Sequence, residues 1–160
     1  EACLWSESLS EKGIRRRATV LRADGSETLT DADPDDIPER EPGEWIVNPD
    51  GAIVRAGLVR HYAAKHGLWQ LDPRIAYLTG DAVPAGARGF RILHRLRFDR
   101  REIRKTLHAL DCGALEILVR GLDVDPDQLR AQLKLRGDRP LALIATRIGR
   151  AGVAFVAESH

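Results

Sequence analysis

Apolar and polar residues follow two different periods in the second half of the chain. Four apolar runs, at 90–98, 115–121, 141–148 and 152–158, have the length of strands. Residues 99–110 and 126–135 instead repeat apolar positions at helical spacing. The pattern predicts the order strand, helix, strand, helix, strand, strand, with a tight turn at 149–152 before the last strand.

Each predicted helix has a start signal and one apolar face. Asp99 precedes the first helix, and Asp125 precedes the second, with Pro126 at its first position. The faces expected to be buried consist of Ile103, Leu107 and Leu110 on the first helix and Leu129 and Leu133 on the second. Helices between strands favour an α/β (α+β) sandwich in which both helices cover one face of a small mixed sheet.

The middle of the chain, 43–87, predicts a smaller α/β module. "WIVN" at 45–48 indicates a strand, and the turn residues of "NPDG" follow it directly. A helix is expected from about Ala52 to Lys65, ending at Gly67. A short strand at 75–81 and a loop at 82–89 complete this module.

The first 42 residues predict a hairpin followed by a linker. Alternation at 15–22, a turn at 23–25 and "SETLT" at 26–30 indicate paired strands, which need a partner surface to be stable. Residues 31–42 combine three prolines with an excess of acidic residues, a composition typical of linkers. The expected organisation is therefore hairpin strands at 1–30, an acidic linker at 31–42, a small module at 43–87 and the sandwich at 88–160.

The composition is that of a water-soluble domain. Of the 160 residues, 43% are apolar and 31% charged, and no apolar run reaches the roughly 18 residues of a membrane span. We therefore expect no membrane partner and a cytoplasmic location. Cys3 and Cys112 are far apart and lack ligand spacing, so we expect two reduced thiols and no metal site. The chain starts at Glu1 and contains no methionine, which predicts a piece of a longer protein.

Charge divides the chain into two unlike halves. Residues 1–87 hold 10 Lys/Arg and 15 Asp/Glu, net −5, whereas residues 88–160 hold 15 and 9, net +6. Five basic residues fall between Arg97 and Leu110, and those expected on the solvent side of the helix are Arg100, Arg101, Arg104 and Lys105. A second set on and after the next helix consists of Arg130, Lys134, Arg136 and Arg139. If the sets merge, they form a phosphate-binding surface; the alternative is a plain solvated face.

No catalytic or cofactor motif accompanies these charges. The sequence lacks a P-loop, a GxGxxG before a helix and a GxSxG. "GARG" at 86–89 is expected to be only a loop, and the five histidines are expected to be structural or exposed. Trp5, Trp45, Trp69 and both tyrosines lie in apolar segments and are expected to anchor the core or an interface. We therefore assign no catalytic, cofactor-binding or metal residue.

Several segments resemble a known family. "LEILVRGLDVDPDQLRAQLKLRG" and "ALIATRIG" are similar to the THUMP-like domain at the C-terminus of bacterial class I S-adenosylmethionine-dependent methyltransferases. "GEWIVNPDGAIVRAGLVRHYAAKHGLWQLDPRIAYLTGD" resembles the ferredoxin-like module that precedes this domain, and "ACLWSESLSEKGIRRRATVLR" resembles the last strands of the catalytic domain. The resemblance implies S-adenosylmethionine as cofactor of the parent chain, none in this piece, and the catalytic domain as a partner.

The resemblance also implies a function for the basic helix. THUMP domains bind RNA and present it to a neighbouring catalytic domain, so this piece is expected to be non-catalytic and to recognise a substrate RNA such as tRNA or rRNA. The residues expected to contact RNA phosphates are Arg100, Arg101, Arg104, Lys105, Arg136 and Arg139. The alternative is a structural or interaction domain of a methyltransferase that acts on a protein or a small molecule.

Overall fold

The computed structural model describes residues 3–9, 11–23 and 25–160, and it confirms the order of elements predicted after residue 87. These elements are β6 (Arg88–Arg97), α3 (Arg100–Ala109), β7 (Cys112–Arg120), α4 (Pro126–Leu133), β8 (Arg139–Ile148) and β9 (Ala151–Ser159). In both helices the predicted cap, Asp99 or Asp125, accepts hydrogen bonds from two backbone N–H groups of the first turn.

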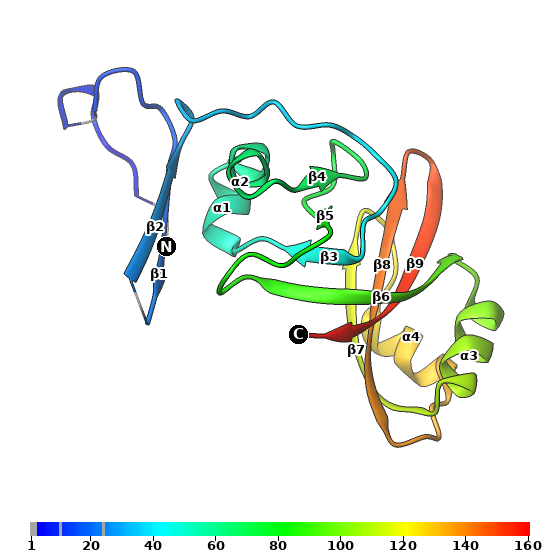
Figure 1. Cartoon of the computed structure of the whole chain (residues 1–160). Coiled ribbons are helices and arrows are strands. Elements are labelled where there is room, and N and C mark those ends of the chain that lie inside the picture. The colour runs from blue at the N-terminus through cyan, green and yellow to red at the C-terminus, as the bar shows by residue number, and fades with distance from the viewer. Residues whose placement is uncertain (1–2, 10, 24) are drawn as a thin grey trace.

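Among the described residues, seven strands form one mixed sheet in the order β4-β5-β3-β6-β9-β8-β7. The strands from the middle of the chain are β3 (Trp45–Asn48), β4 (Trp69–Gln70) and β5 (Leu78–Gly80). β7 and β8 run parallel because α4 connects them, and the other neighbours are antiparallel. Figure 1 shows α3 and α4 near each other at the end of the molecule that is far from β1 and β2.

The sheet face beneath α3 and α4 carries the main core of residues 88–160. Ile103 and Leu107 of α3 and Leu129 and Leu133 of α4 are buried, as predicted, and Leu110 is half-buried. They pack with alternating residues of the central strands, which are Leu141, Leu143, Ala154 and Val156. Each such side chain contributes about 1.5–3 kcal/mol by leaving water, so this face fixes the orientation of both helices.

The opposite face is covered by the segment between β4 and β5. Ile75 and Tyr77 of this segment pack against Phe90 and Phe155 of the sheet. Arg120, at the end of β7, donates to the carbonyl oxygen of Ala76 at 2.7 Å and lies 4.4 Å from the centre of the Tyr77 ring. Burial raises the pKa of Tyr77 to about 12, which keeps its hydroxyl neutral at physiological pH.

Asp72 joins this segment to the turn between β8 and β9. Its side chain is only 2% exposed and accepts the backbone N–H groups of Arg74 and Gly149, both at 2.8 Å. Arg147 lies 3.7 Å from the same carboxylate. Burial raises the pKa of a carboxyl group, but these hydrogen bonds and the Arg147 charge outweigh it, so the pKa of Asp72 lies below its usual range.

The helix predicted from Ala52 to Lys65 is in fact two helices, α1 (Gly51–Arg55) and α2 (Val59–His66). Gly57 between them has a φ of +68°, a left-handed conformation that ends the first helix. The prediction of one helix was wrong because the apolar pattern continues across Gly57 whereas the backbone turns. The predicted stop at Gly67 is confirmed by its φ of 66°.

The acidic segment 31–42 is packed against the protein along part of its length, unlike an extended linker. Ile37 is buried in the same cluster as Leu58 and Tyr62. Arg60 of α2 donates to the carbonyl oxygen of Asp35 at 3.1 Å, and Glu39 forms a β-bridge with Gln70. Composition does not reveal these contacts, because they use backbone groups and a single apolar side chain.

Strands from both sides of residue 87 share one sheet. β3 pairs with β6 over four residues, from Trp45 opposite Arg91 to Asn48 opposite Arg88. The sheet therefore continues across the predicted boundary between 43–87 and 88–160, and the division into two modules stays a prediction from sequence.

The predicted hairpin is present as β1 (Arg17–Arg22) and β2 (Gly25–Thr30). Its predicted turn includes Asp24, which lies outside the described residues, as do residues 1, 2 and 10. Ala18, Val20 and Leu29 pack against α1 and α2.

Before the hairpin, a short 3₁₀ helix spans Glu7–Leu9. Trp5 is 69% exposed, so it does not anchor a core within the described part of the chain.

Glu27 links this hairpin to the end of α2. Its carboxylate accepts from Lys65 Nζ at 3.0 Å and from His66 Nε2 at 2.7 Å, and Arg22 lies 3.3 Å away. Burial raises the pKa of this carboxyl, but the hydrogen bonds from Lys65 and His66 outweigh it, so the pKa of Glu27 is lowered.

Among the described residues, none of the helices has the length and apolar composition that a membrane-spanning helix needs.

Candidate nucleic-acid interface

Helix α3 holds four of the six predicted RNA contacts on its outer side. Because Ile103 and Leu107 face the sheet, the remaining sides of the helix face solvent. The side chains placed there are exposed and consist of Arg100, Arg101, Arg104 and Lys105. No ion pair involving any of the four occurs among the described residues. Their positive charge is therefore available to a ligand.

The positions of these four cations along α3 lower the stability of the helix. Arg100 and Arg104, and likewise Arg101 and Lys105, are like charges four residues apart, which lowers helix stability. Arg100 and Arg101 also stand in the first turn, where the positive end of the helix dipole disfavours cations. In α4 the order is the favourable one, with Asp127 in the first turn paired to Arg130 at 2.6 Å. In α3, the acidic Glu102 in the first turn and the Asp99 cap offset part of this cost.

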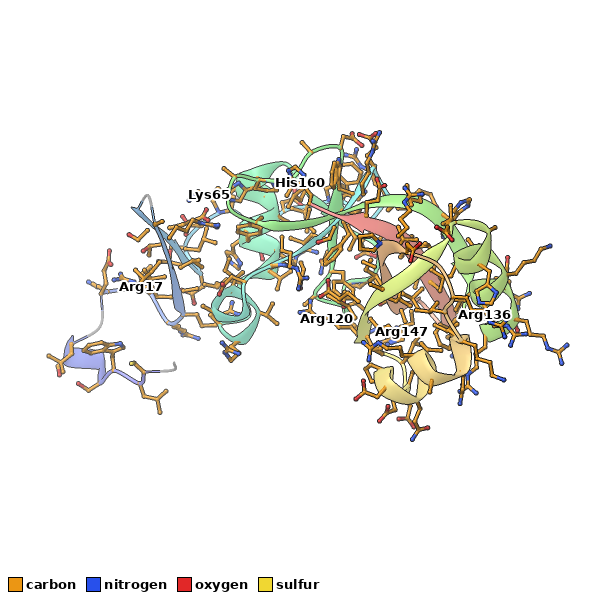
Figure 2. The ribbon with its side chains drawn as sticks, turned by 90° about the horizontal axis from the view of Figure 1, so that it is seen from below. Arg17, Lys65, Arg120, Arg136, Arg147 and His160 are labelled. Carbon is orange, nitrogen blue, oxygen red and sulfur yellow. The ribbon has the colours of Figure 1, made fainter. Side chains whose placement is uncertain are left out.

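The end of α4 adds two cations beside the last turn of α3. Lys134 closes α4 in a left-handed conformation, and Arg136 follows it; both are exposed. His108 of α3 donates from Nε2 to the carbonyl oxygen of Lys134 at 3.0 Å, which joins the two segments. Figure 2 shows Arg136 at the end of the molecule opposite Arg17 of the hairpin. We call the six cations on these two segments the basic surface: Arg100, Arg101, Arg104, Lys105, Lys134 and Arg136.

Two basic residues of the second predicted set have protein partners. Arg139 forms an ion pair with Glu158 of β9. Arg130 pairs with Asp127 and donates from Nε to the carbonyl oxygen of Leu115 at 3.3 Å. Four of the six candidate residues are thus exposed on α3, Arg136 follows the segment that contacts the last turn of α3, and Arg139 is in an ion pair.

Basic residues of β6 are neutralised by acidic residues that precede the sheet. Arg91 pairs with Glu44 at 3.2 Å, and Arg95 pairs with Glu41. Arg88 pairs with Glu116 of β7. Acidic residues of 1–87 therefore compensate Arg91 and Arg95, whereas Arg88 is compensated within residues 88–160.

Two further exposed arginines lie near the start of α3. Arg97 ends β6, and Arg150 stands in the turn between β8 and β9. The N–H of Phe98 donates to the carbonyl oxygen of Gly152 at 2.9 Å, which brings this turn close to the first turn of α3. Sequence analysis did not select Arg150, because only the pairing of β6 with β9 places it there.

The other histidines and cysteines of the described chain have mostly structural surroundings. No group of three or more His, Cys, Asp or Glu residues suited to a metal ion occurs among the described residues. His61 is buried, and His66 is engaged with Glu27. Cys112 is buried, and this burial raises the pKa of its thiol, so it remains protonated and poorly reactive.

Comparison with known proteins identifies the C-terminal part of the chain. Residues 87–159 match the family model described as "THUMP domain-like". We refer to this segment, which makes up less than half of the chain, as the THUMP-like domain after the model that it matches. It contains the whole β6-α3-β7-α4-β8-β9 unit and therefore the whole basic surface.

Relatives extend beyond the THUMP-like domain. The chain is 60% identical over 156 residues to uncharacterized S-adenosylmethionine-dependent methyltransferases from two strains of Mycobacterium tuberculosis. The alignment covers 98% of this chain and 43% of each relative, so the chain spans less than half of their length. A crystal structure of a proposed methyltransferase from Porphyromonas gingivalis shares the fold, with a TM-score of 0.70 and 20% identity, over 87% of this chain and 36% of that protein.

Proposed function

We propose that the basic surface binds RNA phosphates on behalf of a class I S-adenosylmethionine-dependent methyltransferase of which this chain is the C-terminal part. The observation that carries the proposal is the exposure of six cations on α3 and residues 134–136, without acidic partners among the described residues and against the electrostatic preference of the helix. Arginine donates several N–H groups in one plane, which suits phosphate oxygens.

The methyltransferase part of the proposal is supported by the relatives and by the hairpin. The M. tuberculosis relatives that match this chain along nearly all of its length are described as S-adenosylmethionine-dependent methyltransferases. The large apolar side chains that the described structure leaves exposed are Leu4, Trp5, Leu9 and Leu21, all on or before β1. Exposed apolar side chains gathered in one region are typical of an interface, here with the catalytic domain.

In this proposal, S-adenosylmethionine binds to the catalytic domain of the longer protein. Class I enzymes hold such cofactors at a glycine-rich turn between a strand and a helix. In the described residues, the turns from β3 to α1, from β6 to α3 and from β7 to α4 contain at most one glycine each. We therefore assign the cofactor and the methyl transfer to the longer protein, and no residue of this chain to catalysis.

The role of the basic surface in this proposal is to hold and orient the substrate. Phosphate contacts fix the position of a nucleic acid and leave chemistry to another site. We propose tRNA or rRNA as the substrate and the cytoplasm as the location of the enzyme. A structural domain of an enzyme that acts on protein or small molecules would show no RNA affinity.

A titration of the 160-residue chain with a tRNA-sized RNA at two salt concentrations tests the proposal. If six cations contact phosphates, raising the salt from about 50 to about 200 mM weakens binding about a thousandfold. Absence of binding at low salt, or an affinity that does not change with salt concentration, contradicts the proposal.

A further inference from the structure

The two edges of the seven-stranded sheet differ in length and in the partners of their backbone groups. At one edge, β4 is two residues long, and its outer side is already in use. The carbonyl oxygen of Gln70 accepts from the N–H of Arg40 at 3.2 Å, and the N–H of Gln70 donates to the carbonyl oxygen of Pro38 at 3.3 Å. At the other edge, β7 is nine residues long and pairs with β8 alone among the described strands. A long edge of this kind can pair with a further strand.

The composition of β7 leaves this edge open to pairing. The strand contains neither Pro nor Lys, and the irregularity in its register with β8 lies at its start, between Cys112 and Ala114. Ile117 and Leu118 are half-buried and pack against the two cores on opposite faces of the sheet. A neighbouring strand would therefore bury apolar side chains on both faces.

Within the described residues, the second half of β7 is the free part of this edge. In the first half, Arg130 of α4 donates from Nε to the carbonyl oxygen of Leu115 at 3.3 Å and so occupies a main-chain acceptor. The side chain of Arg120 lies over the Tyr77 ring, on a face of the sheet and not across its edge. We call residues Glu116–Arg120 the β7 edge.

The charges of the β7 edge favour one pairing with a second copy of the chain. In an antiparallel pair about a two-fold axis at Leu118, Glu116 of each copy lies opposite Arg120 of the other. An axis at Glu116 would place two carboxylates opposite each other, and an axis at Ile117 would place both charges opposite uncharged residues. Charge therefore selects the register centred on Leu118.

Both charges remain accessible to such a partner. Glu116 pairs with Arg88, but its side chain is still 38% exposed. Arg120 uses Nη1 for its hydrogen bond to the carbonyl oxygen of Ala76, and a guanidinium group has further N–H donors. Opposite charges on neighbouring strands favour pairing and like charges oppose it, so the register can be tested by charge reversal.

We propose that two copies of this chain associate through the β7 edge, antiparallel about a two-fold axis at Leu118, so that their sheets join into one. Main-chain hydrogen bonds supply the affinity, and the two pairs of Glu116 with Arg120 set the register. If a strand of the catalytic domain occupies the β7 edge instead, the 160-residue chain is a monomer.

Sedimentation of two charge-reversed variants over a range of concentrations tests this inference. In a pair of identical chains, Glu116→Lys places basic side chains opposite each other, and Arg120→Glu places acidic ones opposite each other. We expect the unchanged chain to dimerise as its concentration rises, and each variant alone to dimerise at least about tenfold more weakly. An equimolar mixture of the two variants should regain the lost affinity, because both cross-strand pairs then join opposite charges.

The mixture also separates pairing from damage to the fold, since a chain that fails to fold cannot regain its affinity. Glu102→Lys makes the same charge change on α3 and should dimerise like the unchanged chain. A chain that stays monomeric at every concentration overturns the inference and favours a strand of the catalytic domain as the partner. A dimer that neither variant weakens, or a mixture that does not recover, overturns it as well.

Discussion

At the scale of single residues, the partner of each arginine decides its role. Arg104 and Arg139 are both exposed, but Glu158 neutralises Arg139, and Arg104 has no acidic partner among the described residues. An arginine that already has a carboxylate partner gives up that ion pair when it binds a phosphate. Variants of Arg104 and Arg139 can therefore be compared to measure how an existing ion pair affects RNA binding by an exposed arginine.

We expect Arg104→Gln to weaken RNA binding equally for all sequences and to reduce the salt slope by about 1, because one phosphate contact is lost. Arg139→Gln should leave both quantities unchanged. Titrations of the two variants at several salt concentrations measure this difference. An equal loss in both variants would show that the ion pair with Glu158 does not withhold Arg139 from RNA.

Asp72 is the residue on which the contact between the 71–77 segment and the β8–β9 turn depends. We expect Asp72→Ala to lower the free energy of unfolding by about 2–3 kcal/mol, because the N–H groups of Arg74 and Gly149 lose their acceptor. The folded pKa of Asp72 is lowered, so its contribution is complete above about pH 3.8 and is lost as the pH falls through the folded pKa. Urea unfolding from pH 7 to pH 3 measures both effects; unchanged stability in the variant contradicts this role.

At the scale of elements, α3 combines a stable inner face with an unfavourable outer one. The Asp99 cap and the burial of Ile103 and Leu107 hold the helix in place, and this allows its outer face to carry repelling cations. Function and stability therefore oppose each other in the same ten residues.

Arg101→Glu should stabilise the domain by about 0.3–1 kcal/mol, because it places an acid in the first turn and removes the repulsion from Lys105. Asp99→Ala, which removes the cap, should instead cost about 1 kcal/mol. Chemical denaturation at low ionic strength gives both values. Destabilisation by Arg101→Glu would mean that Arg101 serves the fold rather than a ligand.

The hairpin is a second element whose attachment can be tested separately. Glu27→Gln should weaken its attachment to α2 by about 1–2 kcal/mol, because the charged hydrogen bonds to Lys65 and His66 are lost. Since the pKa of Glu27 is lowered in the fold, the attachment is complete above about pH 4.5 and weakens as the pH falls through the folded pKa. Hydrogen exchange should quicken in β1 and β2 and not in β8; equal acceleration everywhere would contradict a local role.

At the scale of the whole molecule, charge is segregated by the fold as well as by the sequence. Glu41 and Glu44 compensate Arg95 and Arg91 on β6, while the six cations of the basic surface have no ion-pair partner among the described residues. Figure 2 shows Arg17 of the hairpin and Arg136 after α4 at opposite ends of the molecule. A hairpin that contacts a catalytic domain and a basic surface that contacts RNA would thus not compete for space.

Local signals in the sequence predicted the features of the fold that are determined by residues close together in the chain. The Asp99 and Asp125 caps and the apolar period of α3 and α4 are such signals, and both helices formed where expected. The break at Gly57 was missed, because a glycine inside an apolar period is compatible with a continuous helix. The shared sheet of β3 and β6 and the ion pair of Arg139 with Glu158 depend on strand pairing between distant segments, which no local pattern contains.

The most direct test of the account compares two charge-reversed chains in an RNA titration at low salt. Arg101→Glu/Arg104→Glu changes the centre of the basic surface, and Lys12→Glu/Arg15→Glu makes the same change in net charge near the hairpin. The account predicts that the first variant loses at least about tenfold in affinity for a tRNA-sized RNA, while the second binds like the unchanged chain. Equal affinity of the two variants would contradict it.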